Sequence, residues 1–98
     1  METLYTYRKQ INNDSVFISI YSSEIEELTT NVQESLKYQT AKYGYTKLGV
    51  LGLVEVEARD KAREELASQE LSTSPKYHKP VTEFYSGLIK DELLRRVF

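Results

Sequence analysis

The sequence predicts a single α+β domain over residues 1–98, with a small mixed sheet and the element order β-β-α-β-α-α. Two observations carry this prediction. Apolar and polar residues alternate on both sides of a short Asn/Asp turn, which is typical of a β-hairpin. Later segments show the helical period of 3.6 residues, and a run that is apolar on both faces lies between two of them. The length of the chain also suits one domain.

The first predicted element is a β-hairpin. The segments LYTYRKQI (residues 4–11) and SVFISIY (residues 15–21) are rich in β-branched and aromatic residues. Three turn formers, Asn12, Asn13 and Asp14, separate them. A short turn between two such segments predicts antiparallel pairing of the strands. Because successive side chains of a strand point to opposite faces, one face of the second strand should carry Val16, Ile18 and Ile20.

An amphipathic helix is predicted from Ser23 to Tyr43. Ser23 and Glu26 have the spacing of a capping box, and Gly44 suits the position just after the last helical residue. Glutamates in the first turn and lysines near the end match the sense of the helix dipole. The apolar side chains that should face the core share one narrow arc: Ile25, Leu28, Val32, Leu36 and Tyr43.

A buried central strand is predicted in YTKLGVLGLVEV, residues 45–56. The run is apolar on both faces from Leu48 to Val54, which is typical of a strand that is covered on both sides. Gly49 and Gly52 suggest a β-bulge or a close backbone contact within it. A helix between two strands favours a right-handed crossover, so this strand is expected to lie parallel to the one before it.

The next predicted helix starts at Glu55 or Glu57 and ends at Leu71. Its composition is strongly helix-forming, but its apolar stripe is thin, so we expect it to be mostly solvated. The stripe consists of Ala58, Ala62 and Leu66. Side chains as small as alanine would let another helix approach closely.

The final helix is predicted from Val81 to Phe98, after a loop over residues 72–80 (STSPKYHKP) and with Pro80 in its first turn. One face of its first half carries Val81, Phe84, Tyr85, Leu88 and Ile89. A second apolar group lies on nearly the opposite face, with Leu93 between the two groups, and consists of Leu94, Val97 and Phe98. This end of the helix either closes the core or, with arginines at its edge, forms an association surface for a second subunit.

Composition limits the chemistry and the compartment. The chain has no cysteine, which excludes disulfides and thiolate metal sites. Asp60 and Glu64 have a spacing that suits a hard cation, but the neighbouring basic residues favour a solvated face of mixed charge. We therefore expect no metal and no cofactor. The chain shows neither a signal-peptide pattern nor an apolar run long enough to cross a membrane, which predicts a soluble cytoplasmic protein.

The stretch KYQTAKYGYTK, residues 37–47, interleaves lysine and tyrosine without an acidic residue. Proteins that bind single-stranded nucleic acid combine basic and aromatic residues in this way. The candidate residues for binding nucleic acid or another anion are Tyr38, Lys42, Lys47, Lys76, His78, Lys79, Arg95 and Arg96. The helical period, however, places Tyr43 in the core and Lys47 in the predicted strand. The favoured interpretation is a solvated helix end, and the net charge of −2 also speaks against a dedicated nucleic-acid binder.

No catalytic motif is evident in the sequence. His78 is the only histidine, and no nucleophile motif points to it as a general base. The tetrapeptide from Gly49 to Gly52 matches G-x-x-G, but its central valine and leucine suit a phosphate-binding loop poorly. Shortness, many tyrosines and the lack of a catalytic motif are common among small proteins of viruses and mobile elements.

The sequence therefore predicts a small non-enzymatic interaction or regulatory module. We expect it to act by binding another macromolecule, as a homodimer whose interface includes Leu93, Leu94, Val97 and Phe98. One alternative is a nucleic-acid-binding protein with a lysine/tyrosine surface. A second alternative is a small-ligand sensor or an enzyme that involves His78.

Overall fold

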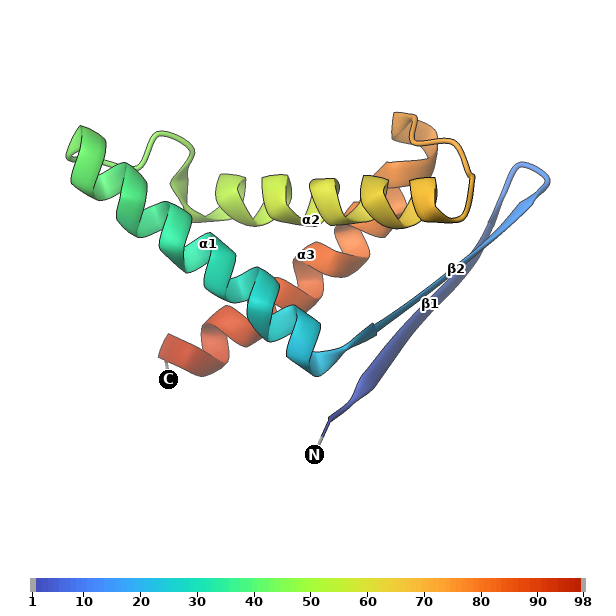
Figure 1. Cartoon of the computed structure of the whole chain (residues 1–98), viewed down its shortest axis with the longest axis horizontal. Coiled ribbons are helices and arrows are strands. Elements are labelled where there is room, and N and C mark those ends of the chain that lie inside the picture. The colour runs from blue at the N-terminus through green and yellow to red at the C-terminus, as the bar shows by residue number, and fades with distance from the viewer. Residues whose placement is uncertain (1, 98) are drawn as a thin grey trace.

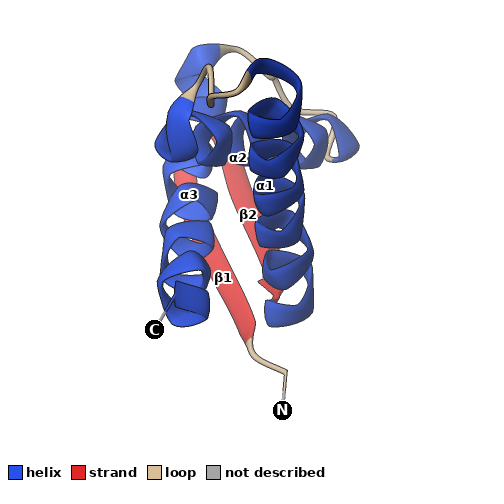
Figure 2. Cartoon of the chain, turned by 90° about the vertical axis from the view of Figure 1, so that its left-hand side faces the viewer, coloured by secondary structure: helices blue, strands red, loops and turns tan. Residues whose placement is uncertain are grey.

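The computed structural model describes residues 2–97 and shows two strands followed by three helices (Figure 1). The elements are β1 (Leu4–Ile11), β2 (Asp14–Tyr21), α1 (Ser22–Tyr43), α2 (Gly49–Ser68) and α3 (Pro75–Val97). In Figure 1, α2 runs across the top and α1 and α3 cross below it. In the turned view of Figure 2, the two strands lie behind α1 and α3, so the helices cover one face of the sheet. The predicted α+β class is confirmed.

The hairpin forms as predicted. The strands pair in an antiparallel register that runs without interruption from Leu4 opposite Tyr21 to Ile11 opposite Asp14. Asn12, in the turn, adopts a left-handed φ of 56°, which Asn tolerates better than most residues do. The buried side chains of the sheet are Ile11, Val16, Ile18 and Ile20. The alternation in the sequence therefore identifies the inner face correctly.

The first helix, α1, follows β2 directly. The predicted capping box is wrong, because the N-cap residue is Tyr21 and no side chain caps the helix. Instead, Ser22 is tied to Thr3, the residue just before β1: its N–H donates to the carbonyl of Thr3 at 2.8 Å, and its hydroxyl accepts from the N–H of Thr3 at 3.0 Å. The predicted end is confirmed, with Gly44 at φ 75° and its N–H donating to the carbonyl of Thr40 at 2.8 Å.

The predicted strand over residues 45–56 and the mixed sheet are wrong, because residues 45–48 form a loop and residues 49–56 form the start of α2. Leu53 and Val54 are buried, and buried positions recur from them along α2 at the helical period. Val50 and Leu51 belong to the same apolar run but are exposed. The run is apolar on both faces because the exposed face at the start of α2 is also apolar. It is not a strand that is covered on both sides.

Helices α2 and α3 make the most extensive helix–helix contact among the described residues. A fully buried stripe on α2 consists of Ala58, Ala62 and Leu66. The fully buried side chains of α3 are Val81, Tyr85 and Ile89. The small alanine side chains allow the two helices to approach closely. This stripe is expected to let a partner helix approach closely, but it is fully covered within this chain, and the prediction of a mostly solvated helix is wrong for this face.

The third helix begins at Pro75, so most of the predicted loop over residues 72–80 is helical. Pro75 suits the first helical position because its fixed φ is close to that of a helix. The first turn is closed by the N–H groups of Tyr77 and His78, which both lie 2.9 Å from the carbonyl oxygen of Ser74. Pro80 therefore lies inside α3 and not at its start.

The core lies between the inner face of the sheet and the helices. From α1 it receives Ile25 and Val32 as buried side chains, and Leu28 and Leu36 as partly buried ones. Tyr43 was expected on this face but is 39% exposed, because α1 extends beyond the core at its C-terminal end. Across residues 2–97, none of the helices combines the length and the apolar character that a membrane span requires.

Candidate interaction surface at the corner between α1 and α2

The connection between α1 and α2 is a short ordered corner. Gly44 ends α1 and Gly49 begins α2, both with positive φ, at 75° and 73°. A residue with a side chain is strained in this conformation, so the glycines let the chain reverse within a few residues. The loop is held by the amide oxygen of Gln39, which accepts from the N–H of Lys47 at 3.0 Å. This hydrogen bond holds the loop backbone at Lys47 against the end of α1.

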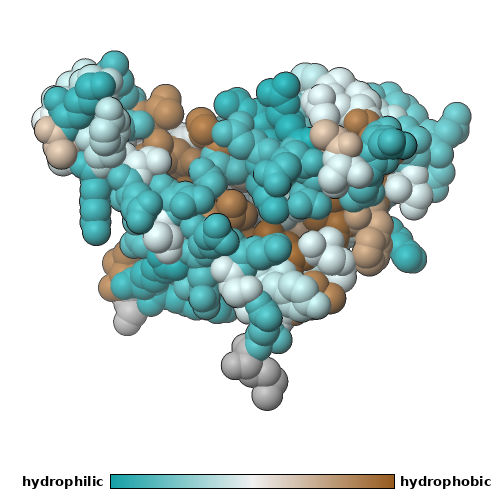
Figure 3. Space-filling model, viewed as in Figure 1, coloured by the Kyte–Doolittle hydropathy of each residue, from teal (hydrophilic) through white to brown (hydrophobic). Residues whose placement is uncertain are grey.

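Exposed hydrophobic side chains concentrate at this corner. Of the eleven large hydrophobic side chains that are exposed among residues 2–97, six lie between residues 38 and 51. We define the corner surface as these six side chains and two lysines: Tyr38, Lys42, Tyr43, Tyr45, Lys47, Leu48, Val50 and Leu51. Figure 3 shows hydrophobic surface at the upper left of the molecule, where α1 ends and α2 begins. A grouping of this kind marks a binding surface more often than scattered exposed residues do.

The two lysines of the corner surface lie against the tyrosine rings. The ammonium nitrogen of Lys47 is 4.2 Å from the centre of the Tyr43 ring. That of Lys42 is 5.4 Å from the Tyr43 ring and 5.5 Å from the Tyr38 ring, and it donates to the Tyr38 hydroxyl at 3.2 Å. Cation–π contacts of this kind hold the charges beside the aromatic side chains. Neither lysine is among the residues that form salt bridges in the described chain.

A groove runs along the C-terminal half of α1 beneath the loop. Its volume is about 710 Å³. It is lined by Asn31, Glu34, Ser35, Tyr38, Gln39, Tyr43, Lys47 and Leu48. The groove therefore has an aromatic and aliphatic end at the corner and a polar end further back along α1. It opens directly onto the exposed tyrosines and lysines.

The structure brings together more of the lysine–tyrosine stretch than the helical period indicated. Tyr43 lies outside the core, and Lys47 lies in a loop instead of a strand, so both predictions are wrong. As a result Tyr38, Lys42 and Lys47 share one surface. The sequence signal that was missed is the apolar run of residues 48–51, which continues this surface onto α2.

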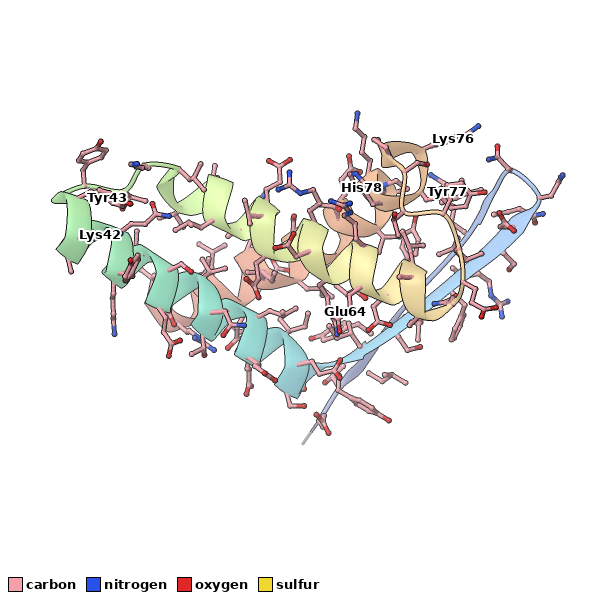
Figure 4. The ribbon with its side chains drawn as sticks, turned by 45° about the horizontal axis from the view of Figure 1, so that its top comes forward. Lys42, Tyr43, Glu64, Lys76, Tyr77 and His78 are labelled. Atoms are coloured by element: carbon pink, nitrogen blue, oxygen red, sulfur yellow. The ribbon has the colours of Figure 1, made fainter. Side chains whose placement is uncertain are left out.

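The other predicted anion-binding residues lie elsewhere. Figure 4 shows Lys42 and Tyr43 at one end of the molecule, and Lys76 and His78 at the other, where α3 begins. Lys79 follows in the same turn of α3. Arg95 and Arg96 are in the last turn of α3. The eight candidate residues therefore form three separate groups and not one surface.

The environment of His78 disfavours its charged form. Burial lowers the pKa of His78, and the nearby positive charges of Arg63, Arg59 and Lys79 lower it further. Its Nδ1 atom is buried and has no hydrogen-bond partner among the described residues. The side chain is thus neutral at neutral pH and packs at the start of α3 beside basic groups.

The guanidinium of Arg96 connects α3 to α1. It donates to the carbonyl of Glu26 at 2.9 Å, to the hydroxyl of Thr30 at 3.1 Å and to the amide oxygen of Gln33. Its Nε atom also lies 3.4 Å from the carboxylate of Glu92. Most of its hydrogen-bonding capacity is therefore used within the chain.

Only some of the apolar residues in the predicted subunit interface at the end of α3 are exposed. Leu93 is partly buried against the core, whereas Leu94 is 56% and Val97 is 74% exposed. Phe98 lies outside the described residues. Two exposed aliphatic side chains alone form a smaller surface than the corner does.

The described part of the chain contains no group of three or more His, Asp and Glu side chains that is placed to hold a metal ion. Asp60 and Glu64 are both exposed on α2. Comparisons with known proteins found no matching family model, no matching curated protein and no matching solved structure. The inference of function therefore depends on the surfaces of this chain alone.

Proposed function

We propose that this chain is a small non-enzymatic interaction module, which acts as a homodimer and binds another macromolecule through the corner surface. The observation that carries the proposal is the concentration of exposed tyrosine, leucine and valine side chains around an open groove. The centres of protein interfaces are enriched in aromatic side chains, and exposed apolar groups gain most from being covered. A protein is the partner that best suits this surface, because part of the surface is aliphatic and gains from being covered by apolar side chains. The aliphatic part consists of Leu48, Val50 and Leu51.

A second candidate function is the binding of single-stranded nucleic acid at the same corner. It is supported by the cluster of Tyr38, Tyr43 and Tyr45 around two lysines that form no salt bridge with any described carboxylate. Bases stack on exposed aromatic rings, and lysines neutralise phosphates. The segment from residue 35 to residue 54 contains three lysines and no acidic residue, although the whole chain has a net charge of −2.

The first experiment recovers binding proteins from extracts of the source cells with the wild-type chain and with a corner variant, Leu48→Ser/Leu51→Ser. A control variant, Phe17→Ser/Tyr21→Ser, removes exposed apolar side chains of similar size from the outer face of β2. The recovered protein is then purified and its affinity measured with all three chains. We expect the corner variant to bind at least about ten-fold more weakly, a loss of about 1.4 kcal/mol, and the control to bind like the wild type. Equal affinity for the corner variant would refute the proposal.

The second candidate is tested by fluorescence anisotropy with labelled single-stranded and double-stranded oligonucleotides at low and physiological salt. If nucleic acid is the ligand, binding of the single strand weakens steeply as salt rises, because counterions are released from the phosphates. Substitution of Tyr38 and Lys47 by alanine then reduces binding. Absence of binding at low salt would reject this candidate and leave the protein partner.

A further inference from the structure

The hairpin exposes two strand edges, and the register shows which backbone groups face outward. In an antiparallel pair, opposite residues alternate between those that exchange hydrogen bonds and those whose N–H and C=O groups point away. Ser22 bonds to the carbonyl of Thr3, so this pair exchanges bonds and the next pair, Leu4 and Tyr21, points outward. Continuing the alternation, the outward residues of β1 are Leu4, Thr6, Arg8 and Gln10.

The two edges differ in how they are covered. On β2, the side-chain amide of Gln69 donates to the outward carbonyl of Phe17 at 2.8 Å, so the end of α2 caps this edge. On β1, the outward N–H and C=O groups make no hydrogen bond with any described residue, and all four of these residues are exposed. The edge of β1 is therefore uncovered along its whole length, whereas the edge of β2 is covered at Phe17.

The usual protections of an edge strand are nearly absent from β1. It contains no proline, and its uninterrupted register leaves no bulge to twist the edge away. The guanidinium of Arg8 lies over the ring of Phe17, 5.6 Å from its centre, so this charge leans toward β2 and away from the open edge. Only Lys9 remains as a charged side chain without such a contact on this strand.

Partly buried apolar side chains lie beneath the same edge. Tyr5 and Tyr7, on the inner face of β1, are only partly covered. The ring of Tyr7 is 5.2 Å from that of Phe84 on α3, and Tyr5 and Leu88 line the same small hollow. Phe84 and Leu88 are themselves only partly buried. A strand added to this edge would therefore gain apolar contacts beneath it as well as backbone hydrogen bonds.

We propose that β1 pairs with β1 of a second copy of this chain, antiparallel about a twofold axis at Tyr7, so that two hairpins form one four-stranded sheet. In this register Leu4 lies opposite the partner's Gln10, and Thr6 lies opposite the partner's Arg8. Every outward N–H and C=O group of these residues then finds a partner. A two-stranded sheet is marginal alone, and the four-stranded sheet pairs the open edge of β1.

A second copy is favoured over a foreign strand because the edge is self-complementary. A twofold interface presents the same surface from both subunits, which an antiparallel pairing of identical strands satisfies. On the inner face, Lys9 then lies opposite the partner's Tyr5, an arrangement that suits a cation–π contact. The like charges of the two Lys9 side chains are separated by the tyrosines at the axis. This inference rests on the homodimer of the proposed function and names the surface that forms it.

The test combines sedimentation equilibrium with amide hydrogen exchange at low and high protein concentration. We expect a dimer of twice 11.4 kDa at high concentration. In the dimer, the amides of Leu4, Thr6, Arg8 and Gln10 should exchange at least about ten-fold more slowly than in the monomer, because they become hydrogen-bonded. The alternate amides, which are bonded within the hairpin, should change much less.

A matched pair of variants separates the two edges. Thr6→Pro removes an outward N–H from β1, and Ser19→Pro removes the outward N–H of the residue opposite it on β2. We expect Thr6→Pro to weaken dimerisation at least about ten-fold and Ser19→Pro to leave it intact. A monomer at all concentrations would overturn the inference together with the proposed homodimer. A dimer in which the four β1 amides stay unprotected would overturn this inference alone, and binding at the corner surface is tested independently of both.

Discussion

The hydroxyl of Tyr77 donates a hydrogen bond of 2.5 Å to the carboxylate of Asp14. The same hydroxyl accepts from the side-chain amide of Asn12 at 3.3 Å. Asn12 lies in the hairpin turn and Asp14 begins β2, whereas Tyr77 is in the first turn of α3. This contact therefore joins the hairpin to the start of α3, which are far apart in the sequence.

We expect Tyr77→Phe to lower the stability of the fold, with an effect that depends on pH. The hydrogen bond to Asp14 raises the pKa of Tyr77 above its usual value of 10.0. The protonated hydroxyl is thus favoured in the folded state, so its contribution is complete below pH 10 and is lost as the pH rises through the folded pKa. Urea unfolding of both proteins at several pH values should give a difference that shrinks above pH 10. A constant difference would show that the hydrogen bond is not its source.

Removal of the hydroxyl of Tyr85 should have the opposite effect. This side chain is fully buried on α3, and its hydroxyl has no hydrogen-bond partner among the described residues. A buried polar group without a partner costs about 1–3 kcal/mol. We expect Tyr85→Phe to keep or raise the free energy of unfolding, by up to about 1 kcal/mol, when measured by urea denaturation. A clear loss of stability would mean that the hydroxyl is hydrogen-bonded in solution.

The close packing of α2 on α3 should not tolerate a larger side chain at Ala62. We expect Ala62→Leu to lower the free energy of unfolding by about 1–3 kcal/mol, because the helices must move apart to accept it. Ala67→Leu is the matched control, since Ala67 is exposed on the same helix and the substitution is the same. The control should change stability by less than about 0.5 kcal/mol. Equal effects of the two substitutions would contradict the packing of α2 on α3.

Two glycine substitutions should change stability in opposite directions. Gly44 has φ 75°, and a methyl group on its Cα atom would meet nothing within 4 Å, so Gly44→Ala should cost about 1–2 kcal/mol from backbone strain alone. Gly87 lies inside α3, and a methyl group there also meets nothing within 4 Å. Gly87→Ala should therefore stabilise the protein by about 0.5–1 kcal/mol. The unfolding temperatures of both variants test the pair. A higher unfolding temperature for Gly44→Ala would contradict the left-handed φ of Gly44 at the end of α1.

A substitution at the corner surface should leave the fold intact. Leu51 is 68% exposed, so Leu51→Ser should change the free energy of unfolding by less than about 0.5 kcal/mol. Leu53→Ser is the comparison, because Leu53 lies two residues further along and is buried in the core. The comparison variant should lose several times more stability in urea denaturation. A large loss for Leu51→Ser would mean that this side chain supports the fold and is not free for a partner.

Part of the candidate site could be predicted from the sequence. The charge pattern identifies Tyr38, Lys42 and Lys47 as candidates, because a stretch without acidic residues is visible without any structure. The aliphatic half of the surface could not be predicted. Val50 and Leu51 have the composition of a buried strand, and only their position at the free end of α2 leaves them exposed.

The sequence by itself determined the hairpin, α1 and the apolar face of α3. The signals for these elements are local: a turn between two alternating segments, a helical period, and a glycine that ends a helix. Residues that are close in the sequence determine the conformation of these elements, so they can be predicted without knowledge of distant contacts.

Only the tertiary structure decided the conformation of residues 45–56 and the position of Tyr43. An apolar run can be covered as a strand or left exposed on a helix, and the outcome depends on which other element packs against it. Here α3 and α1 pack against α2 and its alanine stripe is fully buried, while α1 extends beyond the core. The outer face of the first turns of α2 is consequently left without a cover, and this is the physical reason that the corner surface exists.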